Sequence, residues 1–388
     1  MLTKHILFID PGSSAIKGTV FRTTDGKIIA KHLQEDSGIF QGTIRDSELF
    51  HNSVKKLKKH LEKEIKSSLE SAVLLIGLDL IKFKNISIKE ISLNAFFDEN
   101  MFKKLESQMK SWAEKNSSWL IRSNFLKYFL NQEEIENPKG LYVEKLKANA
   151  NVAYAKKSSL GNMIMVLESV NLNIIDIIPS IFSCAQFHLS EDERKLGSLI
   201  LDIGESGINW AFYYKNKPYQ AGSINHSVIK VIKKLAQKYS IPIKEAKKLM
   251  EMHVSAIIKP ESFCAWAEIK NEYESEFVLE SEVSRTVQGE IEELKFKILK
   301  LIKSFEKSAY LCSLCGSGTW LKCLDELLQK NTSMQIRVSP SQEPAFDSLY
   351  GSMLTFEQTL FIKKNSIFKK AIYWLKNNLW YNNYILTN

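Results

Sequence analysis

Two aspartates, each at the end of an apolar run and before a turn of small residues, are the side chains of this sequence best suited to chemistry. Small residues in a tight turn let backbone N–H groups approach a phosphate closely, and a nearby carboxylate can hold Mg²⁺ through water. One such turn alone fits a purely structural hairpin equally well, but two opposed turns predict a phosphate clamp. The candidate ligands are Asp10, Gly12, Ser13, Ser14 and Lys17 in the first turn and Asp202, Gly204 and Gly207 in the second, with Asp10 and Asp202 holding Mg²⁺ through water.

A third small-residue turn lies near the C-terminus. The apolar run 310–315 is followed by Gly316, Ser317 and Gly318 and then by the start of a helix. Glycine leaves room for a flat group to pack against backbone. We therefore predict that this turn contacts a purine or its ribose.

The elements that must position these turns repeat at half-chain distance. Each aspartate segment has a strand, a turn and a second strand, and each continues past a polar turn, at 25–26 and 215–217, into a third strand. Helical spacing recurs over 47–70, 101–116, 159–170, 226–238, 243–253 and 283–307, with short apolar strands near 72–81, 86–93, 174–178 and 309–315. The pattern predicts an α/β chain with two lobes and a small inserted unit between about 82 and 158.

Composition and charge indicate the binding partners and the cellular compartment of the protein. The net charge is +9, but the lysines are spread along predicted helices, which favours an anionic membrane surface over nucleic acid. We find no apolar run long enough to span a bilayer and no signal-peptide pattern at the N-terminus. The five cysteines suit a reducing compartment, so we expect a cytoplasmic protein.

Cys312 and Cys315 have redox or zinc spacing, but they lie in a predicted buried strand with no second Cys or His pair nearby, which favours a core role.

The last segment, 366–388, has the pattern of a helix that lies in a membrane surface. Apolar residues recur at helical spacing, lysines occupy the other side, and tryptophans flank the boundary. A terminal helix packed on the second lobe is the alternative. The predicted membrane-contacting residues are Ile367, Phe368, Lys369, Lys370, Ala371, Ile372, Trp374, Leu375, Lys376, Leu379 and Trp380.

The three turns, in this order and spacing, resemble the two phosphate segments and the adenosine segment of the actin, Hsp70 and sugar-kinase superfamily. Within it the chain resembles the cell division protein FtsA, on the stretches 140–146, 166–179, 189–197 and 340–351 and on the tail. The resemblance implies an actin-like (ribonuclease H-like) fold. Its implied division is a first lobe (1–81 and 159–197), an inserted subdomain (82–158), a second lobe (198–240 and 308–365), a helical subdomain (241–307) and a membrane-targeting tail (366–388).

The resemblance also implies a function. The protein is expected to bind ATP with Mg²⁺, to polymerise on the cytoplasmic face of the bacterial membrane at the division site, and to anchor the FtsZ ring there while recruiting later division proteins. The helical subdomain is the implied site for the tail of FtsZ, and the insertion is the implied contact with the next subunit of a filament.

Departures from the FtsA pattern put ATP turnover in question. Glu205 stands in the second phosphate turn, Lys247 replaces a Glu that commonly contacts ribose, and Ile178 stands where many relatives carry a polar side chain able to orient water. No clear water-positioning group remains, so weak or absent ATPase activity is expected. Two other functions stay open, an actin-like adaptor of the pilus-assembly type and a sugar-kinase-type phosphotransferase. The kinase lacks an obvious Asp base and would have little use for the tail.

Overall fold

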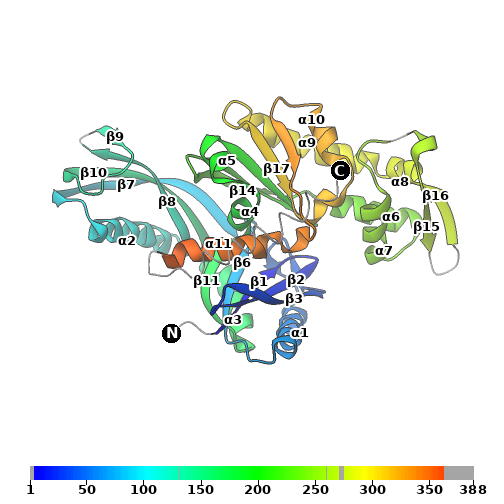
Figure 1. Cartoon of the computed structure of the whole chain (residues 1–388), viewed down its shortest axis with the longest axis horizontal. Coiled ribbons are helices and arrows are strands. Elements are labelled where there is room, and N and C mark those ends of the chain that lie inside the picture. Colours follow the sequence, from blue (N-terminus) through cyan, green and yellow to red (C-terminus); the bar gives the residue numbers. More distant parts are fainter. Residues whose placement is uncertain (1–3, 131, 259, 271–274, 362–388) are drawn as a thin grey trace.

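The structure is a computed structural model that describes residues 4–130, 132–258, 260–270 and 275–361. The predicted membrane-contacting residues, 367–380, lie outside the described residues. Figure 1 shows a central body with one extension at each end of the long axis. Among the described residues, no helix combines the length and apolar character that crossing a bilayer requires.

Two five-stranded sheets with the same topology form the central body (Figure 1). Each starts with a three-stranded antiparallel meander whose first strand is extended by two parallel strands. The first sheet contains β1 (His5–Pro11), β2 (Ala15–Arg22), β3 (Lys27–Glu35), β6 (Ser71–Ile76) and β11 (Asn173–Pro179). The second contains β12 (Ser198–Ile203), β13 (Ile208–Tyr214), β14 (Lys217–Ile224), β17 (Leu311–Cys315) and β18 (Gln335–Val338). The predicted internal repeat and α/β class are confirmed.

Strand β1 is buried on both faces, which explains its continuous apolar run. Ile6 and Phe8 pack with α11 (Asp347–Phe361), whereas Leu7 and Ile9 pack in the core that includes α1 (Ser47–Ile65) and α3 (Lys157–Ser169). The domain division stays a prediction, and α11 packs across it. Helix α11, which the division places in the second lobe, packs on the first sheet.

Helix α4 (Ser180–His188) contacts both sheets and so lies between the lobes. On β12, Ile200 packs in the same core as α4, while Leu199 and Leu201 face a second core. That second core is built with α6 (Ile229–Tyr239), α7 (Ile243–His253), α8 (Glu280–Thr286), α9 (Gln288–Phe305) and α10 (Leu324–Gln329). Helix α5 (Glu191–Leu196) leads from α4 into β12 and begins with a capping box at Ser190 and Glu193.

The two extensions have separate sheets. At one end, β7 (Ile81–Phe96), β10 (Tyr142–Lys156), β8 (Ser118–Leu130) and β9 (Glu133–Ile135) pack on α2 (Glu99–Lys115) around a core of their own. At the other end, β15 (Trp266–Lys270) pairs with β16 (Ser275–Leu279) beside α7 and α8. Short strands β4 (Ile39–Phe40) and β5 (Thr43–Ile44) form a hairpin near the first sheet.

Local differences from the expected elements have tertiary causes. The expected helix 283–307 is two helices, because the chain leaves helical geometry at Val287, whose side chain is buried in the second core. The expected helix 226–238 begins only at Ile229, because the preceding loop is held to the turn that follows Asp202. There Ser227 donates to the carbonyl of Gly204, and the Ile229 N–H donates to the carbonyl of Glu205.

Candidate functional site

The two aspartate turns have the same backbone geometry. In the first, the Gly12 N–H donates to the carbonyl of Ala15 at 3.0 Å. In the second, the Gly204 N–H donates to the carbonyl of Gly207, also at 3.0 Å. The sequence repeat is therefore a repeat of hairpin geometry.

The residues opposite the two aspartates differ. Asp10 is the register partner of Lys17 across the β1–β2 hairpin, and Asp202 is the register partner of Asn209 across β12–β13. Asn209 uses its carbonyl oxygen to accept from the backbone N–H of Leu78 at 2.8 Å, which ties the second hairpin to the end of β6. The first hairpin therefore places a cation, Lys17, opposite its aspartate, and the second places a neutral amide, Asn209, opposite its aspartate.

The two turns touch each other directly. The Ser206 hydroxyl donates to the Ser13 hydroxyl oxygen at 2.7 Å, although the residues are far apart in the chain. Gln41 supports this contact, because its backbone N–H donates to the Ser13 hydroxyl and its side-chain amide donates to the carbonyl of Ser206. The loop between β4 and β5 therefore braces the point where the two halves meet.

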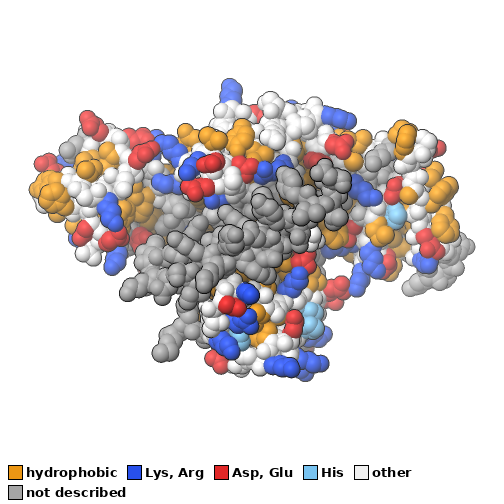
Figure 2. All heavy atoms as spheres, in the orientation of Figure 1, with side chains coloured by type: hydrophobic (Ala, Val, Ile, Leu, Met, Phe, Trp, Pro, Cys, Tyr) orange, Lys and Arg blue, Asp and Glu red, His pale blue; other side chains and the backbone are white. Residues whose placement is uncertain are grey.

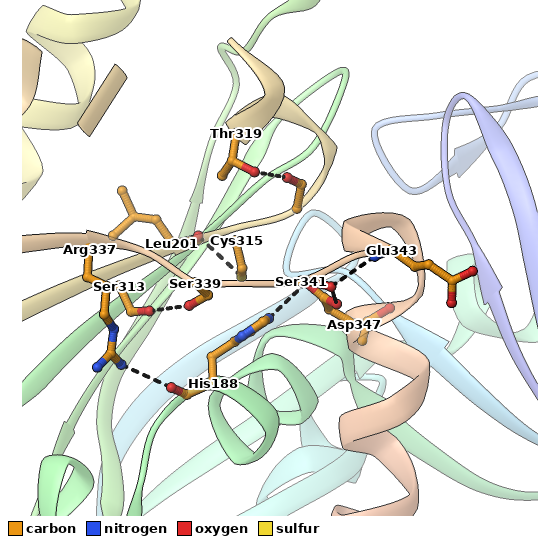
Figure 3. Close-up of polar contacts among 12 residues, drawn as sticks. His188, Leu201, Ser313, Cys315, Thr319, Arg337, Ser339, Ser341, Glu343 and Asp347 are labelled. Atoms are coloured by element: carbon orange, nitrogen blue, oxygen red, sulfur yellow. Dashed lines mark hydrogen bonds and ion pairs between the residues drawn. The ribbon is translucent and has the colours of Figure 1, made fainter. Parts of the chain in front are cut away.

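The third turn packs tightly behind Asp202. Gly316 has φ +85°, and a Cβ there would lie 2.2 Å from Asp202 Oδ1 and 2.8 Å from the carbonyl oxygen of Ile203. Such distances exclude every side chain, so glycine is required both by the conformation and by the close approach. The Thr319 hydroxyl donates to the Gly316 carbonyl and closes the turn (Figure 3).

A cleft of about 470 Å³ lies between the three turns, a volume suited to a small-molecule ligand. Ten of the predicted ligands line it: Asp10, Gly12, Ser13, Ser14, Lys17, Asp202, Gly204, Gly207, Gly316 and Ser317. Gly318 is not among the lining residues, because it is buried against the Ile203 side chain. The structure therefore brings the predicted site together, with Gly318 in a packing position behind it.

Acidic side chains outnumber basic ones around the cleft. Its lining includes the carboxylates of Asp10, Glu35, Asp36, Asp79, Asp202 and Glu205, and the amines of Lys17, Lys244 and Lys247. Each of these lysines is paired with one of these carboxylates, in the pairs Lys17–Asp10 at 2.8 Å, Lys244–Glu35 at 2.9 Å and Lys247–Glu205 at 2.9 Å. A polyanion would enter this cleft favourably only together with a divalent cation.

Asp10 is the centre of a buried polar network. Its Oδ2 accepts from Lys17 Nζ at 2.8 Å and from the Ser348 hydroxyl at 2.7 Å. Burial disfavours the charged form of Lys17, but the carboxylates of Asp10 and Asp202 outweigh it and raise the pKa of Lys17 above its usual value. Lys17 therefore stays protonated and is suited to contact phosphate.

Asp202 has the opposite electrostatic environment. Burial raises its pKa to about 6, with further increases from Asp10 and Asp347 and an opposing decrease from Lys17. The folded protein therefore holds this proton more tightly than the unfolded chain does. Ionising Asp202 above about pH 6 costs folding free energy, and this cost disappears as the pH falls towards the usual pKa of an aspartate.

The variant Asp202→Asn tests this environment, because asparagine mimics the protonated carboxyl group. We expect it to raise the free energy of unfolding at pH 8 by about 1–3 kcal/mol, since the pKa of Asp202 is raised to about 6 and one pKa unit corresponds to about 1.4 kcal/mol. The advantage should shrink as the pH falls below 6. Thermal melts of both proteins from pH 5 to pH 8 measure it, and an advantage that grows towards low pH would contradict the assignment.

The structure also identifies site residues that the sequence analysis missed. Asp79 lines the cleft beside Gly207, and its buried Oδ1 has no hydrogen-bond partner among the described residues. Burial raises the pKa of Asp79, with a partial decrease from a hydrogen bond with Ser223. The signal for Asp79 was present, because it too follows an apolar strand. Ser348 gave no such signal, since it reaches Asp10 only through the packing of α11.

The position expected to orient water lies elsewhere. Ile178 is fully buried in the core beneath α11 and does not line the cleft. On this side of the cleft, α4 contributes Ser180 and Cys184 to the lining. Neither is a general base of the kind that activates water, so the α4 wall of the cleft adds no catalytic carboxylate.

Comparison with known proteins agrees with this geometry. No family model matches the chain. Cell division protein FtsA of Staphylococcus epidermidis is 23% identical over 385 residues, which cover 92% of this chain and 80% of that protein. FtsA of Buchnera aphidicola is 22% identical over 242 residues, which cover 62% of this chain and 58% of that protein. The chain is similar in sequence to FtsA.

Solved structures extend the likeness to the fold. The PilM–PilN type IV pilus biogenesis complex contains a chain that superposes with a TM-score of 0.63 at 14% identity, covering 89% of this chain and 96% of that chain. MreB5 of Spiroplasma citri bound to ADP superposes with a TM-score of 0.55 at 11% identity, covering 94% and 99%. These likenesses confirm the actin-like fold.

Proposed function

We propose that the chain is a bacterial cell division protein that binds ATP with Mg²⁺ in the cleft, polymerises on the cytoplasmic face of the membrane and anchors the FtsZ ring there. The observation that carries the proposal is the repeated aspartate hairpin facing one cleft, in a chain that resembles FtsA over 92% of its length. The recruitment of later division proteins belongs to the same proposal.

The residues present fit a magnesium nucleotide. Asp10 and Asp202 line opposite hairpins of one cleft and would hold Mg²⁺ through water, while Lys17 and the backbone of the two turns would contact phosphate. Bound Mg²⁺ would neutralise part of the phosphate charge. The three cleft lysines supply little of this neutralisation, because each is already paired with a carboxylate. The Ser206–Ser13 hydrogen bond joins the turns where a phosphate tail would lie, so we infer that the nucleotide replaces this contact.

Slow or absent hydrolysis is part of the proposal. Asp79 lines the cleft beside Gly207. It is not paired with one of the cleft lysines, and it is not one of the two aspartates proposed to hold Mg²⁺. Asp79 is therefore the candidate to orient water. Glu205 places a negative charge in the same turn, where it is paired with Lys247. A filament that responds to nucleotide binding, with little turnover, is the function we infer.

The variant Glu205→Gln tests whether phosphate binds at the second turn. We expect the affinity for Mg·ATP to rise about fivefold, because the change removes a like charge and releases Lys247, and a like charge at 4 Å costs about 1 kcal/mol even in water. Calorimetric titration of the full-length protein measures the effect. Chelating Mg²⁺ should lower the affinity of both proteins at least tenfold.

The control is Glu245→Gln, which removes an ion pair with Lys248 that is more exposed than the Glu205–Lys247 pair. Glu245 and Lys248 lie on the same helix as Lys247, but neither lines the cleft. Its affinity for Mg·ATP should equal that of the unmodified protein. If Glu205→Gln and Glu245→Gln behave alike, or if ATP binds equally well without Mg²⁺, the proposed placement of the phosphates is wrong.

Exposed apolar side chains at both ends of the molecule support the proposed assembly. Figure 2 shows hydrophobic side chains gathered over the inserted sheet at one end and over β15–β16 at the other. Phe96 is 68% exposed and lies near Tyr142 at the first end, and Trp266 and Phe277 are each 62% exposed at the second. Exposed apolar groups of this kind are typical of protein contact surfaces. They fit filament contacts and FtsZ binding.

The membrane part of the proposal is tested by vesicle co-sedimentation. We expect the full-length protein, but not a variant ending at Asn365, to pellet with anionic vesicles, and Mg·ATP to increase the pelleted fraction because assembly multiplies weak contacts. Replacing Lys369, Lys370 and Lys376 by glutamate should abolish pelleting, since each lysine near an anionic surface contributes about 1 kcal/mol. If both lengths stay in the supernatant, the tail is not a membrane anchor.

A pilus-assembly adaptor is the second candidate, because the PilM–PilN complex has the higher TM-score of the two structures compared. The two functions differ in partner and share the nucleotide cleft. Binding of purified FtsZ, and no binding of PilN, supports the division role, whereas the reverse result supports the pilus role.

A further inference from the structure

Two buried thiols and a carboxylate form a cluster at the base of the cleft. The ligand atoms of Cys184, Cys315 and Asp202 all lie within 4.8 Å of one another. They come from α4, β17 and β12, so three separate elements converge on one point. The function proposed above uses Asp202 alone and leaves the two thiols without a role.

The geometry of the cluster is set by the fold. Asp202 and Cys315 are register partners on neighbouring parallel strands, which fixes their separation. The Cys315 thiol donates to the carbonyl of Leu201 at 3.4 Å (Figure 3), and this bond orients the sulfur. Cys184 approaches from α4, the helix between the two sheets. Cys184 and Asp202 both line the cleft, so an ion has a path from solvent.

We propose that Cys184, Cys315 and Asp202 bind a thiophilic divalent cation of the Zn²⁺ class. Zinc takes four ligands in a tetrahedron, with sulfur at about 2.3 Å and carboxylate oxygen at about 2.0–2.2 Å. Two thiolates and one carboxylate supply three ligands, and the cleft leaves the fourth position for water. Ligand atoms of such a tetrahedron are about 3.5–4 Å apart, so separations that are at most 4.8 Å here need to contract by no more than about 1 Å.

Charge supports this ligand set. Binding releases the two thiol protons to solvent, and the two thiolates and the carboxylate then carry three negative charges against two positive charges on the ion. The protonated amine of Lys17, which is paired with Asp10 at 2.8 Å, also acts on Asp202 and Cys184 and offsets part of the remaining negative charge. The site also has a specific consequence. An ion bound to Asp202 competes with Mg²⁺, and it joins α4 to the second sheet.

Chain spacing alone does not reveal this cluster. The local pair Cys312 and Cys315 does not form it, because their side chains pack in different cores. The partner of Cys315 is Cys184, which lies far away in the sequence. Cys312 therefore provides a matched control, since it is a buried cysteine on the same strand that faces the other core.

The test is titration of the reduced, chelator-treated full-length protein with Cd²⁺, followed by the ultraviolet absorption of thiolate-to-cadmium charge transfer. We expect saturation at one Cd²⁺ per chain. Cys184→Ala and Cys315→Ala should each weaken binding at least tenfold and halve the absorption, whereas Cys312→Ala should change neither. Zn²⁺ should displace Cd²⁺. No nucleotide is used, so the result is independent of the function proposed above.

Further variants cover the case in which an alanine substitution prevents folding. A protein with Cys264, Cys312 and Cys323 all replaced by alanine keeps Cys184 and Cys315 as its only cysteines, and it should retain the full absorption. The proposal would be overturned if the unmodified protein showed no charge-transfer absorption. It would also be overturned if Cys184→Ala and Cys315→Ala both kept the full absorption. The finding that Cys184 and Cys315 form a disulfide in the protein purified without reductant would overturn it as well.

Discussion

Replacing Gly351 by alanine is expected to destabilise the protein by about 2–4 kcal/mol, although alanine is the stronger helix former. Gly351 lies in α11 where this helix crosses α4 (Figure 1). A Cβ at this position would lie 1.9 Å from the carbonyl oxygen of Ser183 and 2.5 Å from its carbonyl carbon. Backbone atoms cannot turn away as a side chain can, so the two helices must separate and lose packing along their length.

Gly289→Ala is the matched control. Gly289 also lies in a helix, α9, but a Cβ there would meet no atom within 4 Å. Its replacement should be neutral or should stabilise the protein by up to about 1 kcal/mol, through helix propensity alone. Denaturant unfolding of the two variants measures both effects. If Gly351→Ala is as well tolerated as Gly289→Ala, the close helix crossing is wrong.

Asp347→Ala is expected to destabilise the protein by about 1–3 kcal/mol, because removing one partner of a buried hydrogen bond leaves the other unsatisfied. The side chains of His188 and Asp347 are only 1% and 2% exposed, and His188 Nε2 lies 2.9 Å from Asp347 Oδ2. The Ser341 hydroxyl donates to Asp347 Oδ1 at 2.5 Å. Figure 3 shows this cluster, in which Arg337 also donates to the carbonyl of His188.

A double-mutant cycle separates this pair from its surroundings. His188→Ala, Asp347→Ala and the double variant should give a coupling energy above about 1 kcal/mol in denaturant unfolding. Asp192→Ala is the control, since that side chain is 88% exposed and its loss should change stability by less than about 0.5 kcal/mol. Additive effects of the two substitutions would show that His188 and Asp347 do not interact.

Asp347→Ala is also expected to change ligand binding in the cleft. Ser348, the neighbour of Asp347 in α11, donates to Asp10, so a displaced start of α11 removes one of the two hydrogen bonds that hold this carboxylate. We therefore expect Asp347→Ala to weaken Mg·ATP binding as well. Ser348→Ala, which leaves the buried His188–Asp347 pair intact, distinguishes the local effect on Asp10 from the loss of stability.

Much of the site was predictable from sequence because its parts are local. Each aspartate hairpin is specified by a strand, a turn and a second strand within about fifteen residues, and both hairpins form as expected. The third turn was visible for the same reason. Gly318 was predicted as a ligand but packs behind the cleft, because sequence shows that a glycine is needed without showing whether a ligand or the protein itself, here Ile203, fills the space beside it.

What the sequence by itself determined is the α/β class, the repeated hairpins and the resemblance to FtsA, since periodicity and turn chemistry act over short distances. The tertiary structure alone decided the pairing of Lys244 with Glu35 and of Lys247 with Glu205, the Ser206–Ser13 contact and the convergence of Cys184 with Cys315. These contacts join residues from different elements of the chain. Their formation depends on how distant elements of the chain pack against one another, which no local pattern encodes.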